Sequence, residues 1–95
     1  MSVHHNETEQ RFELPIDGQT AVAQYTIDGN VITLTHTEVP AAHRGQGVAD
    51  ELAEAAFEYA RASGLRVVPR CPFMARWLRR HPEYRSLADR GTGAV

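Results

Sequence analysis

The fold of this chain depends on one segment, Thr35-His36-Thr37-Glu38-Val39-Pro40-Ala41-Ala42-His43-Arg44-Gly45-Gln46-Gly47-Val48-Ala49. Its pattern predicts the end of a strand, a break at the proline, a tight glycine turn and the first turn of a helix. Such a turn leaves backbone N–H groups unbonded at a helix N-terminus, where the helix dipole adds partial positive charge. The core of the segment, residues 44–49, is therefore interpreted as a pyrophosphate site. Two glycines also occur in ordinary strand-to-helix connections, so the motif alone leaves both interpretations open.

Length and composition bound the class of protein. The 95 residues predict one domain, residues 1–95, with a small core. The net charge of −2 argues against a general nucleic-acid-binding protein. No apolar run is long enough to span a membrane, and the first residues lack the layout of a signal peptide, so a cytoplasmic protein is expected. A single cysteine, Cys71, excludes an internal disulfide, and no metal site is expected. A monomer or a weak homodimer is expected.

Alternating apolar and polar residues predict antiparallel strands in the first part of the chain. Residues 20–27 and 31–39 are expected to form a hairpin across Asp28-Gly29-Asn30, with residues 11–14 and 3–6 as further strands. Strict alternation puts Ile32, Leu34, His36 and Glu38 on the same face of the second hairpin strand. On this pattern, His36 and Glu38 are expected on the apolar face, next to the glycine turn.

Helical periodicity follows the glycine turn. Residues 46–63 predict a helix that Gly64 ends, and residues 65–69 predict a short strand parallel to the strand before that helix. A second helix is expected to begin at Cys71-Pro72, to bury Phe73, Met74, Trp77 and Leu78, and to end at Pro82. The chain is expected to fray from Leu87 onward. This order of elements predicts an α+β, or α/β layered, domain.

The turn and its flanks resemble the GNAT superfamily of acyl-CoA-dependent N-acetyltransferases. The cofactor motif of that superfamily is Arg or Gln, two residues, Gly, one residue, then Gly or Ala, which residues 44–49 match at every defined position. Residues 36–40, 67–73 and 81–84 are similar to the small, minimal members of the superfamily. The resemblance covers residues 10–87.

This resemblance implies a minimal GNAT fold, with a mostly antiparallel sheet of about four strands followed by a helix, a parallel strand and a helix. It implies acetyl-CoA or CoA as the cofactor and an amine, on a small molecule or a protein, as the acceptor. The strand ending at Val39 would be splayed and would bind the pantetheine arm, while backbone N–H groups from Gly45 to Ala49 would hold the pyrophosphate. Arg44 would contact phosphate or cap the turn. The implied cofactor-binding residues are Val39, Arg44, Gly45, Gln46, Gly47, Val48 and Ala49.

The start of the second helix departs from larger members of the superfamily. Many of those have Asn at the position of Cys71 and a Tyr general acid at the position of Leu78, which cannot donate a proton. Cys71 has the features of a reactive thiol, because it lies at a helix N-terminus beside Arg70. It would carry the acetyl group or donate a proton to the departing CoA sulfur. The alternative is a small buried hydrophobic residue. Tyr84 is a weaker candidate for the missing acid.

His36 and Glu38 are the candidates for a general base. An amine near neutral pH is mostly protonated and must lose a proton before it attacks a thioester, and an imidazole or carboxylate beside the splayed strand can accept it. The alternative is that both side chains have only a structural or solvated role. With the acid and the acceptor-site helices of larger members missing, a non-catalytic CoA-binding module is the alternative function.

Overall fold

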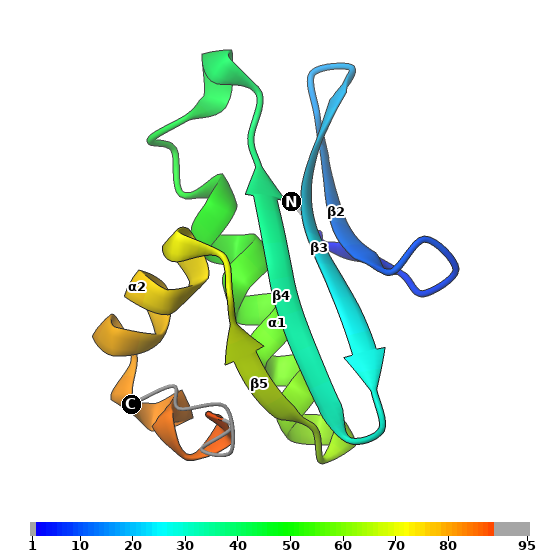
Figure 1. Cartoon of the computed structure of the whole chain (residues 1–95). Coiled ribbons are helices and arrows are strands. Elements are labelled where there is room, and N and C mark those ends of the chain that lie inside the picture. Colours follow the sequence, from blue (N-terminus) through cyan, green and yellow to red (C-terminus); the bar gives the residue numbers. More distant parts are fainter. Residues whose placement is uncertain (1, 89–95) are drawn as a thin grey trace.

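The computed structural model describes residues 2–88 and contains a five-stranded sheet in the order β1-β2-β3-β4-β5 (Figure 1). The strands are β1 (His4–Asn6), β2 (Arg11–Ile16), β3 (Gln19–Asp28), β4 (Val31–Glu38) and β5 (Arg66–Pro69). Strands β1 to β4 pair with one another in antiparallel order, and β5 pairs with β4 in parallel. The expected fold is confirmed.

Two α-helices and two short 3₁₀ helices complete the fold. They are η1 (Ala41–His43), α1 (Val48–Ser63), α2 (Pro72–Arg80) and η2 (Pro82–Leu87). Helix α1 lies across one face of the sheet, and α2 packs beside β5 (Figure 1). Phe57 of α1 stacks on Trp77 of α2, with ring centroids 5.0 Å apart, so the two helices share one apolar core with the sheet. Within residues 2–88, no helix is both long and apolar enough to cross a membrane.

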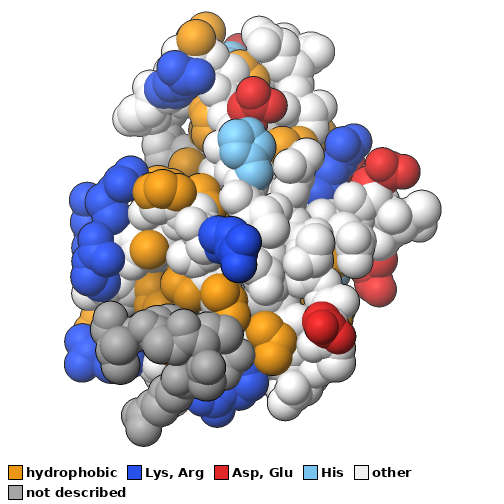
Figure 2. Space-filling model, in the orientation of Figure 1, with side chains coloured by type: hydrophobic (Ala, Val, Ile, Leu, Met, Phe, Trp, Pro, Cys, Tyr) orange, Lys and Arg blue, Asp and Glu red, His pale blue; other side chains and the backbone are white. Residues whose placement is uncertain are grey.

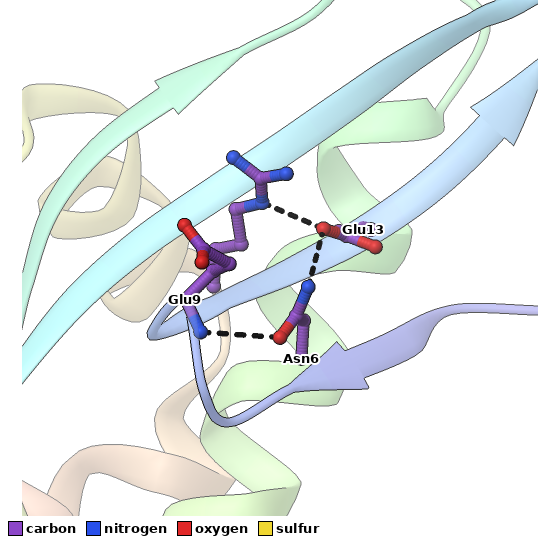
Figure 3. Close-up of polar contacts among 4 residues, drawn as sticks. Asn6, Glu9 and Glu13 are labelled. Atoms are coloured by element: carbon purple, nitrogen blue, oxygen red, sulfur yellow. Dashed lines mark hydrogen bonds and ion pairs between the residues drawn. The ribbon is translucent and has the colours of Figure 1, made fainter.

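Both ends of the described chain are fixed by polar contacts. In the connection between β1 and β2, the Asn6 side chain accepts from the Glu9 backbone N–H and donates to Glu13, and Arg11 also contacts Glu13 (Figure 3). At the other end, Leu87 belongs to η2 and Ala88 forms a bridge with Val67. The rest of the segment expected to fray lies outside the described residues.

Strand β4 contains a bulge that corrects the expected facing of His36 and Glu38. Leu34 pairs with Tyr25, but the next pair along is His36 with Gln24, so Thr35 is an extra residue. Partners across an antiparallel pair lie on the same face of the sheet. After the bulge, Thr37 therefore shares the buried face of Ala23, while His36 shares the exposed face of Gln24. Glu38 pairs with Val22 on that outer face, so the prediction of the apolar face was wrong for both residues.

The parallel pairing of β4 with β5 stops halfway along β4. It runs from Val31 and Arg66 to Leu34 and Pro69, and the Cys71 N–H then donates to the Leu34 carbonyl at 2.9 Å. Pro69 has no backbone N–H, and the chain turns into α2 directly afterwards. In the described structure, residues 36–38 consequently pair with β3 on one side, and residues 35–38 pair with no strand on the other, which is the expected splay.

Candidate functional site

The glycine turn forms the start of α1. Gly45 and Gly47 have φ angles of +82° and +80°, a conformation that side chains with a Cβ disfavour. Gly47 is the N-cap, and the Glu51 N–H donates to its carbonyl at 3.1 Å. The helix begins at Val48 rather than at the predicted residue 46, because a left-handed residue cannot continue a right-handed helix.

The backbone N–H groups of the turn are available to a ligand. No hydrogen bond within residues 2–88 is donated by the backbone N–H groups of residues 45–50. The turn borders a hollow of about 230 Å³ between the end of β4 and the start of α2. Its lining consists of Val39, His43, Arg44, Gly45, Gly47, Val48, Ala49, Asp50 and Phe73. An open hollow with unbonded N–H groups at a helix N-terminus suits an anion.

The side chains of the turn have distinct contacts. The Nε group of Arg44 donates to the Val39 carbonyl at 3.2 Å, so Arg44 caps the end of β4 while it also lines the hollow. Gln46 does not line the hollow, and its Oε1 lies 3.1 Å from Nδ1 of His43. The structure thus gathers six of the seven predicted cofactor-binding residues around the hollow and turns the side chain of Gln46 aside.

Cys71 lies at the N-cap of α2, with Pro72 at the first helical position, as expected. It is 7% exposed, and its Sγ lies 3.6 Å from Oγ1 of Thr37. Burial raises the pKa of the Cys71 thiol, but hydrogen bonds from the Met74 backbone, from Thr37 and from the Phe73 backbone outweigh it. The net pKa of Cys71 is lowered, because these donors stabilise the thiolate more than burial disfavours it. The contacts favour a reactive thiol.

Thr37 is a site residue that the sequence analysis missed. Its hydroxyl meets Cys71 because the bulge at Thr35 turns it toward the buried face. No pattern in the sequence marks the bulge, since threonine is compatible with either face of a strand. The neighbours Phe73 and Met74 at the start of α2 supply the remaining contacts of the thiol.

His36 and Glu38 are not brought together with Cys71. Both are exposed on the outer face of β4, and their shared neighbour Thr37 faces the thiol instead. Glu38 lines a second hollow of about 310 Å³. Its other lining residues are Gln19, Thr20, Val39, Pro40, Ala41 and Arg44. The two hollows share Val39 and Arg44 at the end of β4. On β4 itself, Glu38 shares the outer face of Val22, whereas Thr37, which meets the Cys71 thiol, shares the buried face of Ala23.

Tyr84 is held against the middle of α1. It is 5% exposed, its hydroxyl donates to Glu58, and the guanidinium of Arg61 lies 5.0 Å from the centre of its ring. The hydrogen bond to Glu58 and burial raise the pKa of Tyr84 to about 12. These contacts give Tyr84 a structural role, because its hydroxyl donates its hydrogen bond to Glu58.

The arginines of α2 and Arg70 form an exposed basic edge. Figure 2 shows basic side chains gathered over α2 on the left of the molecule. No ion pair within residues 2–88 involves Arg70, Arg76, Arg79 or Arg80. All four side chains are exposed to solvent. The same residues 2–88 contain no cluster of three or more His, Cys, Asp or Glu side chains that could hold a metal ion.

Comparisons with known proteins agree with the architecture and the motif. A family model described as GCN5-related N-acetyl-transferase matches residues 11–87. Protein NATD1 from Bos taurus is 32% identical over 83 residues, which cover 84% of this chain and 74% of that protein. Protein NATD1 from Danio rerio is 30% identical over 89 residues, 88% of this chain and 81% of that protein. A GCN5-like protein from Staphylococcus aureus, solved in solution by NMR, has a TM-score of 0.74 and 27% identity, over 93% of this chain and 87% of its own.

Proposed function

The chain belongs to the GCN5-related N-acetyltransferase family, and we propose that it binds acetyl-CoA and transfers the acetyl group to an amine. The diphosphate of the donor would bind the free N–H groups of residues 45–50, in the hollow that Arg44 and Phe73 border. The pantetheine arm would follow the unpaired edge of β4 toward Thr37 and Cys71. The donor thioester would then lie where the splayed strand and α2 approach each other.

The observation that carries the proposal is the Cys71 thiol at the end of this path. Its position at the N-cap of α2 and its contact with Thr37 favour the thiolate, the form that attacks a thioester carbonyl. The Cys71 sulfur would form a bond to the acetyl carbon, the bond from that carbon to the CoA sulfur would break, and CoA would leave as a thiolate. An amine would then attack the acetyl-cysteine, return the thiolate of Cys71 and lose its proton to a base or to water.

The outer face of β4 is the proposed side of amine entry. Glu38 and His36 flank Thr37 in sequence and face away from the thiol, so a water molecule or an amine held there would lie across the strand from Cys71. A carboxylate also attracts the ammonium form of an amine before the proton is lost. We assign Glu38 and His36 to acceptor binding and proton removal on this basis.

The test is intact-mass measurement after incubation with acetyl-CoA alone. The expected result is a mass increase of one acetyl group that maps to Cys71, that hydroxylamine removes as it does a thioester, and that an added amine discharges. Cys71→Ala is expected to lose the adduct and turnover but to keep CoA binding by calorimetry, because the residue lies beyond the glycine turn.

Other outcomes would identify a different role. CoA binding with no adduct and no acetylated amine would indicate a non-catalytic binding module. If the wild type acetylates the amine without forming an adduct, and Cys71→Ala abolishes this turnover, Cys71 would be a proton donor to the CoA sulfur. Turnover unchanged in Cys71→Ala would remove the residue from the chemistry altogether.

A further inference from the structure

His43 connects the glycine turn to a hairpin far away in the sequence. Its Nε2 atom lies 3.3 Å from Oδ2 of Asp17, in the turn between β2 and β3, and its Nδ1 atom lies 3.1 Å from Oε1 of Gln46. The His43 side chain is 13% exposed, whereas that of Asp17 is 80% exposed. The imidazole is therefore enclosed between a carboxylate and an amide oxygen at the rim of the hollow.

The two contacts occupy both nitrogens of the His43 ring. The Asp17 carboxylate is an acceptor, so Nε2–H donates to it, while Nδ1 meets the amide of Gln46, which has both a donor and an acceptor atom. The charged groups nearby are Asp17, Arg44 and Asp50, of which Arg44 and Asp50 line the same hollow.

The segment that carries the glycine turn has few other supports. The helix η1 buries no residue, and the two bonds that close it, from the N–H groups of His43 and Arg44, stay within residues 40–44. Within residues 2–88, the contact with Asp17 is the one hydrogen bond or ion pair that joins residues 40–46 to an element not adjacent in sequence. Gly45 and Gly47, both left-handed, have the conformational freedom to depart from the open turn if this contact is lost.

We propose that His43 is a positioning residue: it braces the glycine turn against Asp17, holds the Gln46 side chain clear of the N–H groups, and so sets the affinity for the diphosphate of CoA. This inference rests on the proposed function, since it concerns the same binding site. A turn already held in its open form loses less conformational entropy when it binds.

Dephospho-CoA is the suitable probe, because it keeps the diphosphate but lacks the 3′-phosphate, so its binding reports on the glycine turn. Loss of the contact between His43 and Asp17 is expected to lower its affinity about three- to tenfold.

The experiment is calorimetric titration of the full chain with dephospho-CoA, for the wild type and matched variants. His43→Gln is expected to bind about three- to tenfold more weakly than the wild type, and Asp17→Asn is expected to lose part of the same affinity. The double variant is expected to bind no worse than His43→Gln, because the two residues act through one contact. The controls are His4→Gln on the edge strand and Asp28→Asn in the other hairpin turn, which are expected to behave as the wild type.

An affinity of His43→Gln equal to that of the wild type would overturn the brace. If the wild type does not bind dephospho-CoA at all, the proposed function fails, and NMR relaxation of the backbone amides then tests the brace without ligand. The order parameters of the N–H groups of residues 45–48 are expected to be lower in His43→Gln than in His4→Gln. Equal order parameters in the two variants would also overturn it.

Discussion

The Cys71 thiol lies 3.6 Å from the Thr37 hydroxyl, and the bulge at Thr35 is the reason. Without the extra residue, strict alternation would turn His36 toward the buried face and Thr37 toward solvent. The same bulge lies where β5 ends. Strand β4 therefore reverses which of its side chains face the core, and loses its parallel partner, at the same place. Thr37 and Cys71 thereby meet where β4 and the start of α2 approach each other.

Replacing Thr37 by Val is expected to raise the pKa of the Cys71 thiol. The hydroxyl is one of the groups that lower this pKa, and valine keeps the shape while it removes the donor. Alkylation of Cys71 by iodoacetamide at neutral pH is expected to slow about three- to tenfold, because less thiolate is present. The measurement is the alkylation rate as a function of pH, in which the inflection should move to higher pH.

The matched variants for this prediction are Thr37→Ser and Thr33→Val. Serine restores the hydroxyl and is expected to restore the rate, while Thr33 lies before the bulge and its replacement is expected to leave the rate unchanged. An unshifted profile in Thr37→Val would mean that the backbone of α2 alone sets the reactivity of Cys71.

Replacing Gly45 or Gly47 by Ala is expected to weaken CoA binding through backbone strain. A Cβ at either position meets no atom within 4 Å, so the cost is that of the left-handed conformation, about 1–2 kcal/mol in unfolding free energy. The turn can relieve this strain by leaving its open form, which misdirects the N–H groups. We expect CoA affinity to fall about tenfold or more, as measured by calorimetry.

Gly29→Ala separates strain from binding. Gly29 is also left-handed, with φ of +62°, and its Cβ would also meet open space, but it lies in the turn between β3 and β4. Chemical denaturation should show a similar loss of stability in all three variants, with CoA affinity unchanged in Gly29→Ala alone. Equal affinity in all three would exclude the glycine turn as the diphosphate site.

The sequence predicted the elements well because each has a local signal. Gly47 and Gly64 bound α1, Pro72 begins α2, and Asp28-Gly29 joins β3 to β4. The predicted ligand turn is also a local motif, and all of its residues except Gln46 line one hollow. The facing of His36 and Glu38 could not be predicted in the same way. It depends on where Thr35 is accommodated against β3, which is a property of the pair of strands and not of β4 alone. The roles of Thr37 and His43 depend on Cys71 and Asp17, which are distant in sequence.

The Tyr84 hydroxyl is expected to make stability fall at high pH. The hydrogen bond to Glu58 and burial raise the pKa of Tyr84 from 10.0 to about 12, so the folded state favours the neutral phenol. The stabilisation is fully present below the pKa of the unfolded chain and is lost as the pH rises through the folded value, between about pH 10 and about pH 12. Urea denaturation across this range should show a decrease in the wild type that Tyr84→Phe lacks.

Glu58→Gln tests the cause of this shift. Removal of the carboxylate is expected to lower the pKa of Tyr84 toward its ordinary value, which tyrosine absorbance follows directly. Tyr59→Phe is the control, because the Tyr59 hydroxyl makes no hydrogen bond within residues 2–88. If Tyr84→Phe were to lose acetyl transfer while staying folded, the structural role of Tyr84 would be contradicted.

Replacing Glu38 by Gln is expected to impair the use of the amine while leaving the first half of the reaction intact. Glu38 lies on the outer face of β4, away from the thiol, so acetylation of Cys71 does not require it. The loss of a general base typically costs about 10²–10⁴-fold in rate, and the discharge of acetyl-cysteine by an amine should slow accordingly. The loss should shrink as the pH rises, because more of the free amine is then already deprotonated. His36→Gln is expected to slow the discharge of acetyl-cysteine as well, but by a smaller factor.

The measurements are the rate of adduct formation and the rate of its discharge, each followed by mass spectrometry. An effect of Glu38→Gln on adduct formation, or no effect on discharge, would move the acceptor away from the outer face of β4.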